Sequence, residues 1–147
     1  MRDTTSIAVV GASANPTRAS HEVYSYLVAT GAYRVYPVNP TISEIDGAPT
    51  YPTLAELPEP VDLVDVFRDS NAVPPIAEEA IAIGARCLWL QLGVSHPAAE
   101  ERARAAGLMV VADRCVKIEH ARLFGGLGWA GVDTKVISSH RPQNLPY

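Results

Sequence analysis

The stretch IAVVGASANPTRAS, residues 7–20, decides the fold. It joins an uninterrupted apolar run, Ile7–Val10, to a loop of small and polar residues, Gly11–Ala19. An apolar run of this length is typical of a buried strand in a parallel sheet. Ser20 then predicts the N-cap of a helix that ends at Gly31. A buried strand that leads through a short loop into a helix is the opening of a βαβ unit.

The same alternation of apolar runs and helical patterns continues to the end of the domain. We expect further strands at Val35–Val38, Leu63–Phe67, Cys87–Leu92 and Met109–Ala112, and a short edge strand within Ile42–Tyr51. We expect helices at Asn71–Ile83, His96–Ala106 and Val116–Leu123, and a helical turn at Thr53–Leu57. This order predicts an α/β fold: a single Rossmann-like, doubly wound, mostly parallel sheet of five or six strands.

Length and composition fit one domain and exclude several classes of partner. The 147 residues are 48% hydrophobic and 19% charged, which suffices for one buried core. Twelve Lys and Arg against 16 Asp and Glu give a net charge of −4, and the chain has no basic block. This balance argues against nucleic acid and against an anionic membrane surface as partners. No apolar run reaches the roughly 18–20 residues that cross a bilayer, so we expect a cytoplasmic protein.

The composition changes near the end of the chain. From Phe124 onward the sequence is rich in glycine and closes on a segment that contains proline. We therefore expect residues 1–123 to form the domain. Residues 124–147 would form a tail that packs on the domain or on a partner, which could be another protein or a second copy of the chain.

The ligand of a doubly wound sheet binds outside the carboxyl ends of the strands, where the strand order reverses. If the strand at Leu63–Phe67 lies beside the first strand, the crevice opens between these two. The loop after the first strand then offers free amides and the positive end of a helix, which favour an anion such as a pyrophosphate. Small residues, hydroxyls and one cation could meet it: Gly11, Ala12, Ser13, Ser20 and Arg18.

The loop lacks the motifs of the common nucleotide-binding folds. Ser13 and Pro16 stand where the second and third glycines of GxGxxG would fall. The second strand ends in Val38-Asn39-Pro40, without the Asp or Glu that holds the ribose of NAD. The phosphate-binding pattern GxxxxGK[ST] is also missing. The sequence therefore disfavours NAD, FAD and the chemistry of P-loop nucleoside triphosphatases.

Five motifs occur in order between Ile7 and Leu123. They are Val9–Ser13 with Asn15, Pro16 and Ser20, then Pro37–Pro40, Val61–Arg68, Trp89–Val94 and Asp113–His120. Together they resemble the small stand-alone coenzyme A (CoA)-binding proteins. That family is similar to the N-terminal, CoA-binding domain of the succinyl-CoA synthetase alpha subunit. It lacks the synthetase's second domain, which carries the phosphorylated histidine.

The resemblance implies CoA as the ligand and a path for it. The implied path runs from the pyrophosphate loop with Asn15 and Pro16, past Val38, Asn39 and Pro40 beside the adenosine, to Phe67, Arg68, Leu90, Gln91 and Leu92. It implies that Cys115 lies near the thiol end of the path. The synthetase has a lysine just past its proline-containing turn, where this chain has Thr41-Ile42, so either Arg18 or Arg68 would meet the 3′-phosphate instead.

The sequence leaves three functions open. The first, which we predict, is a non-catalytic module that binds CoA or a short acyl-CoA, with a regulatory role. The second is a small enzyme of acyl transfer or thiol-redox chemistry that uses Cys115. Arg114, Lys117 and the helix that follows could lower the pKa of that thiol, although a buried structural thiol fits equally well. The third is a nucleotide-sensing regulator that acts on a protein partner.

Several other residues carry a structural expectation rather than a chemical one. Asp65 stands in the middle of an apolar strand, and an unpaired buried charge is costly. We therefore expect hydrogen bonds to its carboxylate from loop amides near Ser13 or Ser20. Cys87 begins an interior strand and is expected in the core. The histidines are scattered without the spacing of metal ligands, so no metal is expected: His21, His96, His120 and His140.

Overall fold

The computed structural model describes residues 4–124 of the chain, and a five-stranded sheet crosses the middle of this part. All its neighbouring strands are parallel, in the order β2-β1-β5-β6-β7. The strands are β1 (Ser6–Val10), β2 (Arg34–Val38), β5 (Leu63–Val66), β6 (Cys87–Leu90) and β7 (Met109–Val111). Since β5 lies beside β1, the predicted Rossmann-like, doubly wound topology is confirmed.

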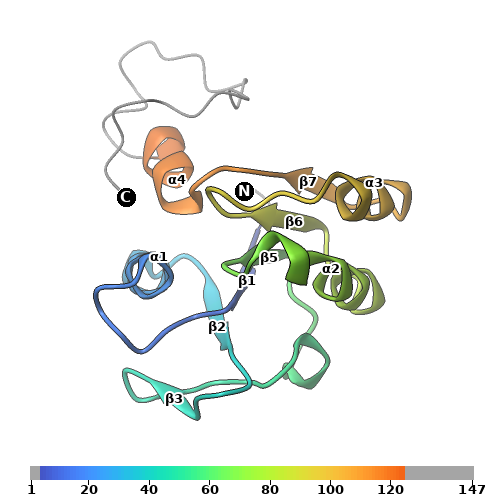
Figure 1. Ribbon diagram of the computed structural model, residues 1–147. Coiled ribbons are helices and arrows are strands. Elements are labelled where there is room, and N and C mark those ends of the chain that lie inside the picture. The colour runs from blue at the N-terminus through green and yellow to red at the C-terminus, as the bar shows by residue number, and fades with distance from the viewer. Residues whose placement is uncertain (1–3, 125–147) are drawn as a thin grey trace.

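Two helices cover each face of the sheet (Figure 1). On one face lie α1 (Ala19–Thr30) and α4 (Val116–Phe124), and on the other α2 (Val73–Ala82) and α3 (Pro97–Ala105). Two 3-10 turns, η1 (Leu54–Glu56) and η2 (Ser70–Ala72), complete the helical elements of the described residues. In residues 4–124 no helix is long and apolar enough to span a membrane. The predicted tail lies outside the described residues, apart from Phe124.

The edge strand expected within residues 42–51 is reduced to one parallel bridge, between Tyr51 and Val38 at the edge of the main sheet. This segment forms a separate antiparallel hairpin, β3 (Glu44–Ile45) and β4 (Ala48–Pro49), so the main sheet has five strands. Asp46 and Gly47 connect the two strands, with positive φ angles of 50° and 84°. Asp-Gly is a preferred pair for a two-residue hairpin loop with positive φ, and such a loop turns the chain back at once.

The predicted N-cap at Ser20 is also wrong. The helix α1 begins at Ala19, and Arg18, two residues before Ser20, occupies the N-cap position with an extended backbone. The Arg18 carbonyl accepts the amides of His21 and Glu22, each at 3.1 Å. Ser20 therefore lies inside the first turn, where it is buried at 7% exposure. The predicted end of the helix at Gly31 is confirmed, with a left-handed φ of 67° at that residue.

Alternate residues of each strand supply the two layers of the core. On β1, Ala8 and Val10 pack toward α2 and α3, whereas Ile7 and Val9 pack toward α1 and α4. Burying a side chain such as Ile7, which is fully inaccessible, stabilises the fold by about 1.5–3 kcal/mol. Asp65 pairs in register with Val9 and Trp89, so it lies in the α1/α4 layer.

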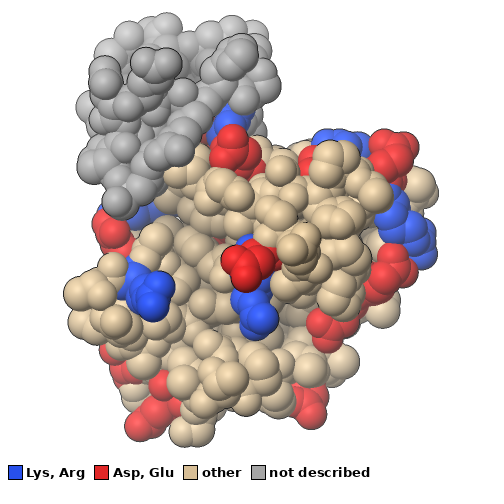
Figure 2. Space-filling view, in the orientation of Figure 1, with Lys and Arg blue, Asp and Glu red and all other residues tan. Residues whose placement is uncertain are grey.

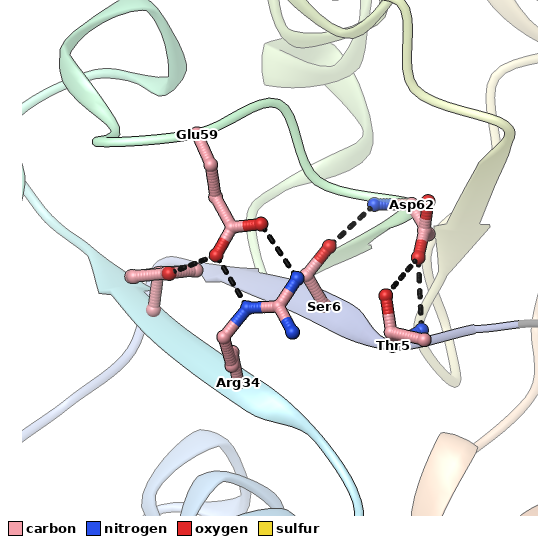
Figure 3. A network of polar contacts seen from close by, with 6 residues as sticks. Thr5, Ser6, Arg34, Glu59 and Asp62 are labelled. Atoms are coloured by element: carbon pink, nitrogen blue, oxygen red, sulfur yellow. Dashed lines mark hydrogen bonds and ion pairs between the residues drawn. The ribbon is translucent and has the colours of Figure 1, made fainter.

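Polar side chains are closely paired around the beginnings of β1, β2 and β5 (Figure 3). The Asp62 carboxylate accepts the Thr5 amide at 2.8 Å and the Thr5 hydroxyl at 2.9 Å. Arg34 donates two hydrogen bonds to Glu59, at 2.6 and 2.7 Å, and the Tyr36 hydroxyl donates a third. This network joins β2 and the start of β1 to the segment that leads into β5.

Candidate functional site

The loops that follow the strands are held side by side at one edge of the sheet. Four backbone amides continue the ladder past the strand ends: Gly11 donates to Val38 at 2.8 Å, Phe67 to Val10 at 2.8 Å, Gln91 to Val66 at 3.1 Å and Arg114 to Leu90 at 3.3 Å. The structure thus brings the predicted site residues of all five strand ends to one edge. We call this the carboxyl edge of the sheet.

Gly11 is required by the fold at this edge. Its φ is +85°, and an added Cβ would lie 2.4 Å from the Phe67 carbonyl oxygen. Ala12 is fully buried in the α1/α4 layer, so only its backbone is available to a ligand. The side chain of Asn39 donates to the Ala12 carbonyl at 2.9 Å and ties the end of β2 to the loop. The small size of Gly11 and Ala12 is therefore required for packing, and it would also let a ligand approach the backbone.

The rest of the first loop is exposed and internally braced. The Ser13 hydroxyl accepts the Asn15 amide at 3.0 Å, and the Asn15 side chain accepts the Thr17 amide at 3.0 Å. Pro16 and Arg18 are exposed beside them. The loop leads directly into the N-terminus of α1, whose unpaired amides carry partial positive charge. It therefore presents a preformed surface suited to an anion.

Two basic side chains at this edge are left without an acidic partner. Neither Arg18 nor Arg68 forms an ion pair with any residue in the described range 4–124. Figure 2 shows basic side chains over α1 and others near the centre of the face, where an acidic side chain adjoins them, with mostly uncharged surface between the two places. Both arginines are therefore available to a negatively charged ligand.

A hollow of about 190 Å³ lies between the carboxyl edge and the start of α2. Among the predicted site residues, Val38, Pro40 and Arg68 line it. Complete ligand pockets measure about 300–1,000 Å³, so this hollow accommodates only part of a larger ligand. Its remaining lining includes residues that were not predicted to belong to the site: Pro52, Thr53, Leu54 and Glu79.

One backbone pairing places most of the unpredicted lining residues at the hollow. Tyr51 donates its amide to Pro37 at 3.0 Å and accepts the Asn39 amide at 2.9 Å. This parallel bridge carries the following segment, Pro52–Leu54, against the end of β2. Glu79 comes from α2, and burial raises the pKa of its carboxyl. The apolar residues at helical spacing on α2 predict which face of that helix is buried. They do not predict that Glu79 lines the hollow.

The far end of the edge contains Gln91 and Cys115. Both are buried, at 5% and 8% exposure. The Gln91 side-chain oxygen accepts the Val116 amide at 3.4 Å. The indole of Trp89 donates to the Arg114 carbonyl at 2.8 Å and fixes the turn before Cys115. Leu92, half-buried, follows Gln91.

Of the two interpretations of Cys115 that the sequence left open, a thiol with a lowered pKa and a buried structural thiol, the structure favours the second. Burial raises the pKa of this thiol, although hydrogen bonds from the Ile118 amide, the Gln91 side chain and the Lys117 amide act against the increase. The two cations that were expected to help are bound elsewhere. Arg114 donates to the Asp113 carbonyl at 2.6 Å, and the Lys117 ammonium group lies 2.6 Å from Glu22.

The expected hydrogen bonds to Asp65 are also absent. Its carboxyl is fully buried, and neither oxygen has a hydrogen-bond partner among residues 4–124. Burial raises the pKa of this group well above its ordinary value. Strand β5 lies between β1 and β6, and Val9 and Trp89 are its register partners there. Apolar neighbours on both sides keep the loop amides away from the carboxyl.

One arrangement of side chains has the composition of a hydrolytic triad but not its setting. His21 lies 2.9 Å from Asp46 and 3.4 Å from the Ser25 hydroxyl. Ser25 stands inside α1, where the backbone amides are used by the helix itself, so they cannot stabilise an oxyanion. We interpret this set as a tether between α1 and the β3–β4 hairpin.

His120 and Cys87 both take part in packing between the helices and the sheet. The Tyr26 hydroxyl lies 2.7 Å from Nδ1 of His120, so this ring joins α1 to α4. Cys87 is half-buried at the start of β6 and packs against the α1/α4 layer, and burial raises its pKa to about 11. Within the described part of the chain, no group of three or more His, Cys, Asp or Glu residues could hold a metal ion.

Comparison with known proteins identifies the family. Residues 5–121 match the CoA binding domain family along nearly the whole described chain. The chain belongs to this family. The resemblance inferred from the five motifs is therefore confirmed, and the carboxyl edge is the region where this CoA binding domain carries those motifs.

Relatives of this CoA binding domain are of two kinds. Among stand-alone proteins, it is 40% identical over 115 residues to the uncharacterized protein YneT of Bacillus subtilis, covering 78% of this chain and 84% of YneT. A hypothetical protein of Pyrococcus horikoshii has a TM-score of 0.82 at 39% identity, covering 84% of this chain and 87% of that one.

The other kind is a much larger enzyme. The alpha subunit of an ADP-forming acetate–CoA ligase II of Pyrococcus furiosus is 40% identical over 57 residues. That match covers 39% of this chain and 12% of the ligase subunit. The chain therefore shares one portion with the ligase subunit and lacks a match to the remainder.

Proposed function

We propose that this domain binds CoA, or a short acyl-CoA, along its carboxyl edge as a non-catalytic module. The observation that carries the proposal is the family match over residues 5–121, which includes every residue predicted for the site. The elements of the edge supply a suitable surface for each part of the ligand.

The first loop and the start of α1 suit the pyrophosphate. The helix has 12 residues, and its N-terminus carries the equivalent of about half a positive charge. Arg18 adds a full charge beside it, and the loop is held open by its own Ser13 and Asn15 hydrogen bonds. Binding at this loop therefore needs no rearrangement of the backbone.

The hollow beside Val38 and Pro40 suits the adenosine. Its lining is mainly apolar, and Arg68 stands at its border without an acidic partner. A planar base fits such a surface, and a 3′-phosphate on the attached ribose would then meet Arg68. Arg18 is the other candidate for this phosphate, as the sequence predicted.

The pantetheine arm would run along the edge toward Gln91 and Cys115. From the loop after β1 to the end of β6 it crosses two strand spacings, about 10 Å. This is a short span for an extended pantetheine arm. Phe67 and Leu92, both half-buried, provide apolar atoms along that span, whereas the Leu90 side chain is fully buried in the layer under α2 and α3 and offers none. The reactive end of the ligand would lie at Gln91.

Calorimetric titration tests the proposal. We expect CoA to bind more tightly than dephospho-CoA, because only CoA carries the 3′-phosphate, and we expect NAD not to bind. Replacing the arginine that meets this phosphate should weaken CoA by about tenfold and leave dephospho-CoA unchanged. Arg68→Ala and Arg18→Ala distinguish the two candidates, and Arg86→Ala, an exposed arginine before β6, is the control.

Three results would contradict the proposal. Equal affinity for CoA and NAD would remove specificity for CoA, and no uptake of any CoA derivative would remove the binding function. Turnover of acetyl-CoA or succinyl-CoA by the purified chain would show that the module is an enzyme. Pull-down with and without CoA then asks whether binding regulates a protein partner.

A further inference from the structure

Two side chains of opposite charge line the hollow beside the carboxyl edge. Arg68 follows β5, and Glu79 belongs to α2. Although both line the same hollow, they form no ion pair with each other or with any other residue in the range 4–124. The hollow therefore offers a ligand a cationic hydrogen-bond donor and an anionic acceptor at two separate places.

The position of Arg68 sets the direction in which a nucleotide can lie. Its Cδ atom is 3.0 Å from the place of a Cβ added to Gly11, so this side chain lies against the start of the first loop. That loop and the N-terminus of α1 suit the phosphates. A nucleotide whose phosphates meet the loop and Arg68 therefore places its base in the hollow.

The walls of the hollow suit the two faces of a base but leave few partners for its edge. Three proline rings, rigid and without an N–H group, belong to the lining: Pro40, Pro52 and Pro75. Among the described lining residues, polar side chains come only from Thr53, Arg68 and Glu79. Because the hollow measures about 190 Å³, a bicyclic base that fills it contacts most of this lining.

Glu79 has acceptor capacity to spare for such a base. Its side chain is half-buried at the hollow, and no other side chain in residues 4–124 pairs with it as a cation. The backbone amide of Leu54, another lining residue, is the group that hydrogen-bonds to the carboxyl. An ionised carboxyl has about four acceptor positions, so this one bond leaves others open to a ligand.

The neighbouring acid on the same helix provides an internal comparison. Glu78 is exposed and lies 3.1 Å from the Arg102 guanidinium of α3. It lines a different hollow, between α2 and α3, together with His96. Glu78 therefore has a cation as its partner, whereas Glu79 faces the carboxyl edge without one.

We propose that Glu79 selects adenine as the base of the ligand by accepting a hydrogen bond from its 6-amino group. The inference rests on the proposed CoA site, which brings the base into the hollow. Guanine and hypoxanthine carry a carbonyl oxygen at position 6, and this acceptor would face the carboxylate without a proton between them. A site built to accept from an N–H group discriminates strongly against an analogue that lacks it.

Calorimetric titration with two ligands tests the selection in the native chain. The ligands are CoA and the CoA analogue in which hypoxanthine replaces adenine. We expect CoA to bind at least tenfold more tightly, since a hydrogen bond to a charged group is lost in the analogue. Equal affinity for the two ligands would overturn the proposal without any need for a variant.

Two variants assign the selection to Glu79. Glu79→Gln keeps the shape and one acceptor, and its amide nitrogen can donate to the carbonyl of hypoxanthine, so we expect the two affinities to come within about twofold of each other. Glu79→Ala should weaken CoA by about tenfold and leave the analogue unchanged. Glu78→Gln is the matched control and should keep the native preference.

A merely structural role of Glu79 predicts a different pattern. Loss of its hydrogen bond with Leu54 alone would weaken both ligands equally and keep their ratio, and that result in both Glu79 variants would overturn the proposal. The same titrations separate this inference from the proposed function. If the native chain binds CoA and the analogue equally, base selection fails and CoA binding stands. If it binds neither, the binding proposal itself has failed.

Discussion

The two edges of the sheet use polar residues in opposite ways. At the edge where the strands begin, Asp62 and Glu59 are fully engaged by Thr5, Arg34 and Tyr36 (Figure 3). At the carboxyl edge, two arginines lack acidic partners within the described residues. The acids at the first edge therefore stabilise the fold, whereas the two arginines at the second are available to a ligand.

The pKa values of the acids follow the same division. Hydrogen bonds from Arg34 lower the pKa of Glu59 to about 2, and the Thr5 amide lowers that of Asp62. Burial without partners raises the pKa of Asp65, halfway between the edges. Acids with partners favour the folded state at neutral pH, whereas Asp65 opposes it. The following predictions test this division, from the largest expected effect on stability to the smallest.

Gly11→Ala should have the largest effect, because the carboxyl edge needs this glycine for the fold itself. The added Cβ would clash with the Phe67 carbonyl, and the residue would be held at a φ of +85°. Strain and overpacking together predict a loss of about 3 kcal/mol in the free energy of unfolding. Urea denaturation measures this loss.

Gly47→Ala is the matched control for that variant. Its φ is +84°, nearly the same, but nothing lies within 4 Å of an added Cβ. Only the conformational penalty remains, about 1–2 kcal/mol. Equal losses at the two glycines would show that the contact with Phe67 does not matter.

Asp65→Asn should stabilise the protein at neutral pH. The raised pKa means that the folded state holds a proton on Asp65 which the unfolded chain releases above about pH 4. Stability is therefore lost as the pH rises from that value toward the folded pKa, and asparagine removes this dependence. We expect a gain of about 4 °C in the unfolding midpoint at pH 7 and little gain at pH 3. Thermal scans between pH 3 and pH 8 measure it, and a gain independent of pH would contradict the buried charge as its cause.

The sequence predicted the elements well where burial alone determines them. The strand at Ile7–Val10 and the helix end at Gly31 follow from an apolar run and a left-handed C-cap, and both were found. The hairpin at Asp46-Gly47 was missed, although this pair is itself a hairpin signal. Ser20 failed as an N-cap because the extended backbone at Arg18 places the N-cap two residues earlier.

The site was predictable only as far as topology determines it. Parallel strands bring Gly11, Phe67 and Gln91 to one edge whatever their side chains do. The lining by Pro52 depends on the distant pairing of Tyr51 with Pro37, which no local pattern reveals. The isolation of Asp65 depends likewise on which neighbours pack against it.

Glu59→Gln should have a small effect at neutral pH and a larger one on acid stability. The depressed pKa of Glu59 contributes stability above about pH 4.5, and this contribution is lost as the pH falls toward 2. Because the pair with Arg34 is exposed, we expect the midpoint at pH 7 to fall by less than about 3 °C. The native chain should lose this advantage over the variant below pH 3, as acid titration of the circular dichroism signal would show. CoA affinity should be unchanged, since this edge lies away from the proposed site.

Arg68→Ala should change stability least and binding most among these variants. Its side chain is exposed and has no ion pair within residues 4–124, so its removal leaves no buried group without a partner. The unfolding midpoint should stay within about 1 °C of the native value, because surface changes away from such features are nearly neutral. If Arg68 meets the 3′-phosphate, CoA affinity should fall by about tenfold while dephospho-CoA is unaffected. Arg34→Ala makes the reverse test at the other edge: it removes a paired cation, so it should lower the midpoint and spare CoA affinity. If Arg68→Ala and Arg34→Ala changed the unfolding midpoint and the CoA affinity in the same way, one edge would not serve stability and the other binding.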